Sequence, residues 1–266
     1  MGVRGLMTYC RPIQRHANMK VRGHRIGIDA FSLFFLFREK RDEFKAYLQS
    51  LLALDHKLTF VMDKRAAKEK REVVEERKEI RKEAKADADA TVIAMAEADD
   101  AGELDTQQQE ILKKHIALKE RDAWCLYPEY VSWFKTLLHE LGIPLEWASE
   151  EADEVLAAGD YDVVISSDSD LLILGVKRLW IYKGKHTEIC RDDFSRFIGL
   201  EGEQLFQMAF LAGCDVQPRI IVPIKIAVSW MRFYKSLNII QKKHPDVVTM
   251  KDLEDYEKLR ASVWCP

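Results

Sequence analysis

Several apolar segments of this sequence end in acidic residues, and these acids are the side chains best placed to do chemistry. They are Asp29, Asp63, Asp168, Asp170 and Asp215. In an α/β sheet, ligands bind at the edge where the carboxyl ends of parallel strands meet. Any one of these acids could be an ordinary turn residue or helix cap. All of them at one edge would instead form a cluster of negative charge.

Such a cluster is costly unless cations neutralise it. Two carboxylates about 5 Å apart repel by roughly 3 kcal/mol at an effective dielectric near 20. The window 149–170 contains eight acids, Asp168 and Asp170 among them, and no Lys or Arg. Ligands that are all oxygen, without His or Cys, suit Mg²⁺ or Mn²⁺ rather than zinc. Two such ions about 4 Å apart are a common device for the attack of water on a phosphodiester.

Strands that alternate with helices must position these acids. The apolar segments predict strands at 26–28, 58–62, 145–148, 163–165, 179–182 and 187–189. Helices are predicted at 64–85, 86–102, 106–121, 127–141, 150–158, 191–198, 202–211, 222–234 and near Lys251. This order predicts an α/β fold, with a central mixed, mostly parallel sheet and helices on both faces. We expect a single domain over residues 1–266, because a chain of this length can bury one core together with a helical insertion.

Charge is distributed unevenly, although the formal net charge of the 266 residues is only −3. From Lys64 to Lys85, ten of 22 residues are Lys or Arg and six are Glu. That composition is typical of a solvated helix or of one that binds a polyanion. No apolar run is long enough to cross a bilayer, so we expect no membrane partner. The five cysteines lie far apart without zinc-ligand spacing, which indicates reduced thiols in an intracellular protein.

Motifs over about residues 1–230 resemble, in their order, those of the flap endonuclease/XPG family of 5′-nucleases. The motifs are Met1–Leu6, Ile28-Asp29-Ala30, Val61-Met62-Asp63, Gly142-Ile143-Pro144 followed by Ser149–Glu154, Ser167–Leu172 and Leu211–Asp215. The Asp-x-Asp motif carries little weight by itself, whereas the whole ordered set is specific. The resemblance implies a PIN-like 5′-nuclease fold.

The resemblance also implies a site for two Mg²⁺ ions, with Mn²⁺ as a substitute. One ion would be held by Asp29, Asp63, Glu151 and Asp153, and the second by Asp153, Asp168, Asp170 and Asp215. Asp153 would bridge the two ions. The ligand set is therefore an implication of the family, whereas the preference for a hard cation follows from the residue types themselves.

Contacts with DNA are a further implication. Lys70 and Arg77 fall where the family places cations on the scissile phosphate, although a solvated helix with Glu–Lys pairs is the alternative. Phe35 matches an aromatic that stacks on the terminal nucleobase, and a core position would suit it almost equally well. Gly2 lies in the N-terminal signature and is expected to contact DNA. Residues 64–124 would form a helical arch that selects strands with free 5′ ends.

The region 202–240 departs from the family. There the family has a helix-turn-helix anchor for duplex DNA whose turn reads Gly-Ile-Gly-Pro-Lys, whereas this chain has Ile221–Ala227 without glycine. A Cβ on each residue should obstruct the approach of backbone amides to a phosphate, so we expect a degenerate anchor without its monovalent-ion site. The helix near Val222 would then offer only Lys225 and Arg232 to a duplex. These departures would fit a divergent branch, such as that of a large DNA virus.

The function expected from these features is a structure-selective DNA endonuclease and 5′-exonuclease that acts in replication, repair or recombination. Its partners would be DNA with a 5′ flap, a branch or a free 5′ end, and no sliding-clamp motif is visible. We expect it in the nucleus, or in the cytoplasm if the chain is viral. The alternatives are a nuclease of the same fold acting on single-stranded DNA or RNA, a sugar-nucleotide transferase with a similar Asp-x-Asp motif, and a non-catalytic scaffold. None of the expected metal acids is missing, which disfavours the scaffold.

Overall fold

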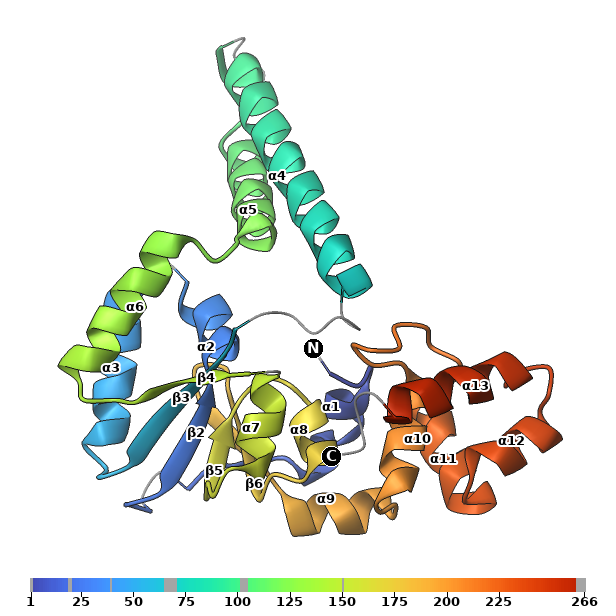
Figure 1. The fold of residues 1–266 in the computed structure, drawn as a ribbon. Coiled ribbons are helices and arrows are strands. Elements are labelled where there is room, and N and C mark those ends of the chain that lie inside the picture. The colour runs from blue at the N-terminus through green and yellow to red at the C-terminus, as the bar shows by residue number, and fades with distance from the viewer. Residues whose placement is uncertain are drawn as a thin grey trace. The chain divides into compact units, whose positions relative to one another are not determined.

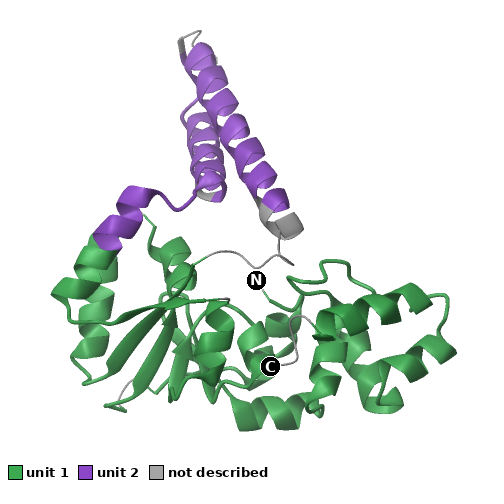
Figure 2. Cartoon of the chain, in the orientation of Figure 1, with its two compact units in different colours: residues 1–67, 135–266 green, residues 68–134 purple. Residues whose placement is uncertain are grey.

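The computed structural model describes residues 2–18, 21–38, 40–64, 71–100, 105–149 and 151–261 (Figure 1). In addition, the side chains of residues 71–74, 77, 100 and 121 lie outside the description. The chain forms two compact units (Figure 2). The first contains Met1–Ala67 and Lys135–Pro266, and the second contains Lys68–Phe134.

A mixed sheet of seven strands lies at the centre of the first unit, counting the strands of the described residues. Its strands are β1 (Arg15–His16), β2 (Arg25–Asp29), β3 (Lys57–Asp63), β4 (Leu145–Ala148), β5 (Val163–Ile165), β6 (Arg178–Tyr182) and β7 (His186–Cys190). Their order is β1-β7-β6-β5-β2-β3-β4. The five strands from β6 to β4 are parallel, β7 pairs antiparallel with β6, and β1 pairs antiparallel with β7. The predicted sheet is therefore confirmed, and the short strand β1 is added to it.

Helices cover both faces of this sheet, as predicted. The first unit contains α1 (Leu6–Tyr9), α2 (Ala30–Phe37), α3 (Arg41–Leu52), α7 (Ala152–Ala158), α8 (Asp170–Leu174), α9 (Arg191–Ile198), α10 (Glu203–Ala212), α11 (Ile224–Tyr234), α12 (Leu237–Lys243) and α13 (Met250–Leu259), with a 3-10 turn at Arg11–Ile13. Helices α11, α12 and α13 lie beside the sheet and not on its faces (Figure 1). Helix α6 (Pro128–Glu140) begins in the second unit and ends in the first. None of the helices in the described ranges is long and apolar enough to cross a membrane.

Two neighbouring residues of β3 show that the faces are covered by different helices. The ring of Phe60 contacts Phe44 of α3, with ring centroids 6.3 Å apart. Thr59 points to the opposite face, because side chains alternate along a strand. On that face Gly27, which pairs with Thr59, leaves room for Leu156 of α7; a Cβ on Gly27 would lie 2.8 Å from the Leu156 side chain. Close packing of α7 on the sheet therefore depends on this glycine.

Helices α2 and α3 were not predicted from the sequence, although α3 carries a clear signal. Its buried residues are Phe44, Tyr47, Leu48 and Leu51, at the spacing of one helical face. Helix α2 is apolar over nearly all of its length, so its periodicity is weak. An apolar run of this length cannot be assigned to a helix or a strand by periodicity alone.

The second unit contains an antiparallel pair of helices, α4 (Arg71–Asp100) and α5 (Thr106–Ala123). Asp87 of α4 forms an ion pair with Lys119 of α5 at 2.6 Å, and Asp99 accepts a hydrogen bond from Gln109 at 2.5 Å. The sequence predicted two helices over 64–102, whereas the structure has one continuous helix from Arg71 to Asp100. The predicted stop at Gly102 lies outside the described residues.

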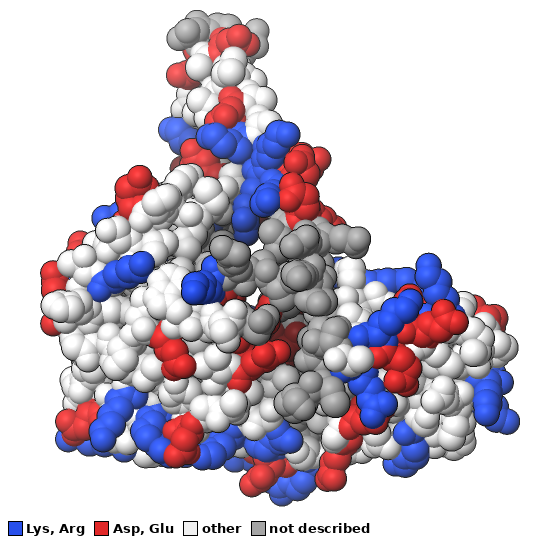
Figure 3. Space-filling view, viewed as in Figure 1, with Lys and Arg blue, Asp and Glu red and all other residues white. Residues whose placement is uncertain are grey.

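Small residues hold this pair of helices together. The more buried residues of α4 are Arg81, Ala84, Ala88, Thr91, Met95 and Ala98, which alternate in steps of three and four. On α5 the corresponding residues are Gln109, Leu112, Ile116 and Lys119. These are coiled-coil spacings. A search for large apolar residues misses this stripe on α4, because its most buried members are Ala84 and Ala88. These small side chains allow close approach of α5. The outer surface carries charges of both signs (Figure 3).

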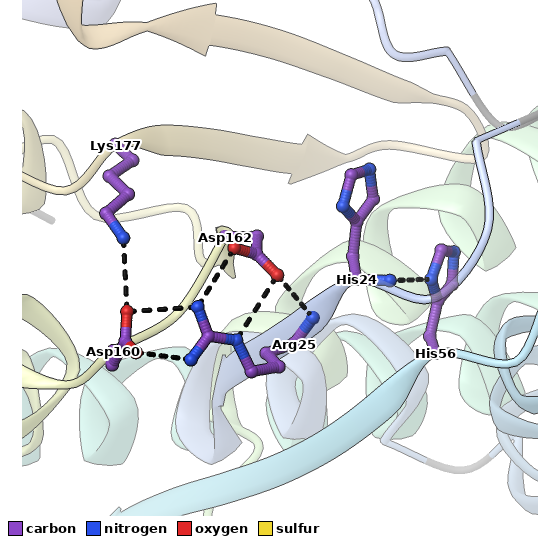
Figure 4. A network of polar contacts seen from close by, with 6 residues as sticks. All are labelled: His24, Arg25, His56, Asp160, Asp162 and Lys177. Atoms are coloured by element: carbon purple, nitrogen blue, oxygen red, sulfur yellow. Dashed lines mark hydrogen bonds and ion pairs between the residues drawn. The ribbon is translucent and has the colours of Figure 1, made fainter.

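The amino ends of the strands are fixed by polar contacts at the edge of the sheet opposite the acids (Figure 4). Arg25, the first residue of β2, pairs with Asp160 and Asp162 from the α7–β5 connection, and Lys177 pairs with Asp160 at 3.2 Å. Arg25 holds the pKa of Asp162 down at about 2. Ion pairs at an exposed edge contribute little energy individually, so their main effect is on the position of the loop.

Three buried histidines lie beside this network. The backbone N–H of His24 donates to Nδ1 of His56 at 3.1 Å (Figure 4), and the two rings stack with centroids 5.5 Å apart. Nε2 of His186 lies 3.2 Å from the hydroxyl of Tyr47. Burial, and then the neighbouring His56, lower the pKa of His186 to about 4. The folded protein therefore holds His186 neutral at a pH at which the unfolded chain takes up a proton.

We predict that this histidine makes the fold sensitive to acid. With a folded pKa below the unfolded value, the stabilisation is complete above about pH 6.5 and is lost as the pH falls towards 4. Between pH 7.5 and 5 the loss should be about 2 kcal/mol. Urea denaturation at these two pH values measures it. His186→Gln should reduce the loss, whereas His16→Gln, on an exposed histidine of β1, should not. An unchanged loss in His186→Gln would contradict the assignment.

Candidate active site

Asp29 ends β2 and caps the helix that follows. Its Oδ1 accepts a hydrogen bond from the backbone N–H of Ser32 at 3.3 Å, and its Oδ2 accepts one from Oγ of Ser166 at 2.8 Å. Burial is the main cause that raises the pKa of Asp29 to about 6, and the charges of Asp168 and Asp63 raise it further. The two hydrogen bonds act in the opposite direction. The pairing of β2 with β3 and β5 places Asp29, Asp63 and Asp168 at the same edge of the sheet.

Asp63 links the end of β3 to the start of α7. Its Oδ1 accepts a hydrogen bond from the backbone N–H of Ala152 at 2.5 Å. Ala152 is the first residue of α7, Glu151 is its N-cap residue, and Asp153 lies in the first turn. The contact therefore brings the two acids of this helix start to the carboxyl end of β3.

Asp168 and Asp170 follow β5, which is the neighbour of β2 on its other side. Oδ1 of Asp168 accepts a hydrogen bond from the backbone N–H of Asp170 at 2.9 Å, and the backbone N–H of Asp168 donates to Oγ of Ser166 at 3.0 Å. Asp170 is the first residue of α8. β3 and β5 therefore lie on opposite sides of β2. The carboxyl ends of these strands form a topological switch point, the kind of position at which ligands bind in α/β sheets.

Asp215 reaches the same region from the C-terminal helices. It follows α10 and the adjacent Cys214, whose thiol pKa is raised to about 12 by burial and then by the charges of Asp170 and Asp215. The raised pKa keeps Cys214 protonated at neutral pH, and a thiol is a poor metal ligand. The backbone N–H of Arg4 donates to the carbonyl of Gly213 at 2.8 Å, so the N-terminal segment is fastened to this loop.

Gly2 lies against Asp168. Its φ is +65°, and a Cβ there would lie 2.2 Å from Oδ1 of Asp168 and 2.4 Å from Oγ of Ser169. Ser169 also donates weakly to the carbonyl of Val3 at 3.4 Å. Glycine is required here both by its backbone conformation and by the lack of space. The predicted contact of Gly2 with DNA remains a prediction.

Ser166 is a residue of this site that the sequence analysis missed. It is 1% exposed, and its hydroxyl donates to Asp29 while it accepts from the backbone of Asp168. It therefore connects the ends of β2 and β5. The neighbouring pair Ser32 and Ser167 makes a second link, with 2.8 Å between the hydroxyls. In the sequence, the signal for this role was the position of Ser166 and Ser167 directly after the apolar segment 163–165.

The donor set fits a hard divalent cation. All seven predicted ligands are carboxylates of the first unit, and the protonated Cys214 beside them does not compete for the metal. Over the described ranges, with their gaps at 65–70, 101–104 and 150, no three acidic, histidine or cysteine side chains already surround one cation position. A physical reason is visible in Asp29, Asp63 and Asp168, each of which has an oxygen turned to a backbone N–H. The assignment of individual ligands remains a prediction.

The structure describes Phe35, the predicted DNA-binding aromatic, more fully than the predicted cations Lys70 and Arg77. Lys70 lies outside the described residues, and Arg77 lies in α4 with a side chain that is also outside the description. Phe35 is 37% exposed on α2, whereas its neighbour Phe34 is completely buried. Phe34 therefore occupies a core position, whereas Phe35, for which a core position was the alternative, does not. Stacking of Phe35 on a nucleobase remains a prediction.

The candidate duplex anchor consists of α10, a loop and α11. In the loop, the backbone N–H groups of Ile221 and Val222 both donate to the carbonyl of Leu211 at 3.0 Å. Arg232 was expected to be available to a duplex, and it is an exposed residue of α11. Its guanidinium donates to the carbonyls of Ile198 and Phe197, where it satisfies the C-terminal end of α9. Lys225 is exposed at the start of α11.

The sequence matches no family model and no curated protein. The fold, however, is similar to that of several solved structures. One is the catalytic core of Rad2 in complex with DNA substrate, with a TM-score of 0.65 and 16% identity over 98% of this chain and 79% of that chain. A further Rad2 complex with DNA has a TM-score of 0.64 and 17% identity over 100% of this chain and 81% of that chain.

Human GEN1 in complex with Holliday junction DNA has a TM-score of 0.57 and 18% identity, over 98% of this chain and 62% of that chain. At these identities the similarity establishes the fold. The chain therefore has the fold that the catalytic core of Rad2 and human GEN1 share, and the mixed α/β sheet predicted from the sequence agrees with it.

We predict that divalent cations stabilise the protein through these carboxylates. Mg²⁺ at a hundredfold excess over its dissociation constant should stabilise the fold by about 2.7 kcal/mol, and EDTA should reverse the effect. Asp168→Asn should melt at a higher temperature than the wild type without metal, because one repelling charge is gone, and should lose most of the rise with Mg²⁺. Asp192→Asn, on the exposed first turn of α9, is the matched control. Differential scanning calorimetry tests the site, and an undiminished Mg²⁺ shift in Asp168→Asn would refute it.

Proposed function

We propose that this protein is a Mg²⁺-dependent, structure-selective nuclease that hydrolyses DNA phosphodiesters, with Mn²⁺ as a substitute metal. The observation that carries the proposal is the meeting of Asp29, Asp63 and Asp168 at the switch point of a fold shared with the catalytic core of Rad2. A crowd of carboxylates at the carboxyl ends of parallel strands is costly without cations, and hard cations are the partners that suit it.

Each acid would have a definite part. Asp29, Asp63, Glu151 and Asp153 would hold one metal ion, and Asp153, Asp168, Asp170 and Asp215 would hold the other. When bound, the metals would supply activation of a water molecule and neutralisation of charge on the phosphate. The hydroxyl of Ser166 would keep the carboxylate of Asp29 oriented and the turn at Asp168 fixed, so that both face the substrate.

The remaining predicted residues would hold DNA. Lys70 and Arg77 would stabilise negative charge that grows on the scissile phosphate. Phe35 would stack on a nucleobase, and Gly2 would let the substrate approach Asp168 closely. Residues 64–124 would select strands with a 5′ flap, a branch or a free 5′ end. Replication, repair and recombination are the processes that produce such DNA.

A second candidate is a nuclease of the same fold that acts on single-stranded DNA or RNA. The hydrogen bonds that the backbone N–H groups of Ile221 and Val222 donate to Leu211 favour it, because these two groups are then not offered to a duplex. The two candidates differ in the substrate that is cut fastest.

A panel of labelled substrates tests both candidates. Flap, nicked, forked and single-stranded DNA and single-stranded RNA are incubated with Mg²⁺, and kcat/KM is measured for each. The proposal expects the flap or the fork to be cut fastest, and Asp168→Asn to lose several orders of magnitude in kcat while it still binds the substrate. Fastest cleavage of single strands would support the second candidate. Wild-type levels of cleavage by Asp168→Asn would contradict the metal mechanism.

The altered anchor yields a separate prediction. A longer duplex arm on a flap substrate should improve affinity little, because the loop before α11 offers no backbone amides at Ile221 and Val222. The slope of log affinity against log salt should also stay nearly constant, since each added phosphate contact steepens it by about 0.9. Titrations with short and long arms at several salt concentrations measure this. A long arm that steepens the slope by about two contacts would show that the anchor binds a duplex after all.

A further inference from the structure

Helix α13 contacts the chain on both sides of Asp215. On the side before Asp215, the ring of Tyr256 lies edge to face with Phe210 of α10, with ring centroids 5.4 Å apart. The hydroxyl of Tyr256 also donates weakly to Glu203 of α10 at 3.4 Å. Helix α10 ends at Ala212, just before Asp215. The C-terminal helix is therefore packed on the helix that leads to this acid.

On the side after Asp215, an ion pair joins α13 to the loop between α10 and α11. Nη1 of Arg219 donates to Oδ1 of Asp252 at 2.9 Å, and the side chain of Asp252 is only 3% exposed. The other oxygen, Oδ2, accepts from the backbone N–H and from the hydroxyl of Thr249, each at 2.7 Å. Asp252 thus caps α13 with one oxygen and holds Arg219 with the other. Because a buried carboxylate is costly without a partner cation, this contact fixes the place of Arg219.

Arg219 belongs to a compact loop that also contains Asp215. The backbone groups of Cys214 and Gln217 exchange two hydrogen bonds, at 2.8 and 3.1 Å, and close a turn around Asp215. A Cβ on Gly213 would lie 3.2 Å from the carbonyl oxygen of Arg219, so the chain before and after Asp215 is in close contact. A displacement of Arg219 would therefore be passed on to Asp215.

We propose that Arg219 and Asp252 are positioning residues for Asp215, through which they set the affinity of the carboxylate site for Mg²⁺. The inference rests on the proposed function, because it takes Asp215 as a metal ligand. Neither Arg219 nor Asp252 is itself assigned as a ligand. Their ion pair holds the loop that carries one, and loss of such an outer partner typically lowers metal affinity or activity about 10-fold to 100-fold.

The Mg²⁺ concentration at the midpoint of the rise in melting temperature tests the inference without DNA or cleavage. Arg219→Gln should move this midpoint to about tenfold higher Mg²⁺, and Arg219→Lys should restore most of the loss. Arg260→Gln is the matched control, because it removes another ion pair between α13 and α10, to Glu203 at 3.3 Å, that does not involve the loop. It should leave the Mg²⁺ midpoint unchanged, whatever its effect on the melting temperature in EDTA.

A double-mutant cycle tests whether the two residues act as one unit. Asp252→Asn should shift the Mg²⁺ midpoint in the same direction, and adding Arg219→Gln to it should change the midpoint little further. In cleavage assays both variants should need more Mg²⁺ but recover kcat at saturating Mg²⁺, with an unchanged KM for DNA.

Two outcomes would overturn the inference and leave the proposed function intact. One is a wild-type Mg²⁺ midpoint in Arg219→Gln, and the other is an equal shift of the midpoint in the control Arg260→Gln. A wild type whose melting temperature does not respond to Mg²⁺, and which cuts no substrate of the panel, would instead contradict the proposed function and this inference with it.

Discussion

Repulsion between carboxylates at the carboxyl ends of β2, β3 and β5 is the constraint to which the rest of the first unit is fitted. Two such carboxylates about 5 Å apart repel each other by roughly 3 kcal/mol. This is a large fraction of the free energy of unfolding of a protein. Their effect is visible in Asp29, where burial and the charges of Asp168 and Asp63 raise the pKa to about 6. Without bound cations, the fold must hold these carboxylates together by other interactions.

Backbone donors at helix starts provide those means. Asp29 accepts from Ser32 in α2, and Asp63 accepts from Ala152 in α7. A helix start offers unpaired N–H groups and a partial positive charge, so each acid stabilises a helix while the helix stabilises the acid. The reading of these acids as helix caps and their reading as metal ligands are therefore compatible, because a cap occupies one oxygen of a carboxylate that has two.

The two edges of the sheet are built on different principles. The carboxyl edge collects like charges, as a ligand site does. The amino edge pairs Arg25 with Asp160 and Asp162 (Figure 4). It also buries three histidines near Trp180. Opposite charges are thus paired at the amino edge, whereas the carboxyl edge holds the unbalanced negative charge. The pair of helices in the second unit is independent of both edges, since it is held by its own stripe of small residues on α4.

Local pattern alone determined much of this protein. Apolar runs predicted the six main strands, and the acids behind them predicted a hard-cation site, because strand length and side-chain alternation are short-range properties. Contacts between distant residues were decided by the tertiary structure. They include the order of the strands, the bonds of Arg232 to the end of α9 and the close contact of Gly2 with Asp168. Ser166 shows the limit most clearly. Its role as the link between Asp29 and Asp168 requires β2 and β5 to be neighbours, although they are more than a hundred residues apart in the chain.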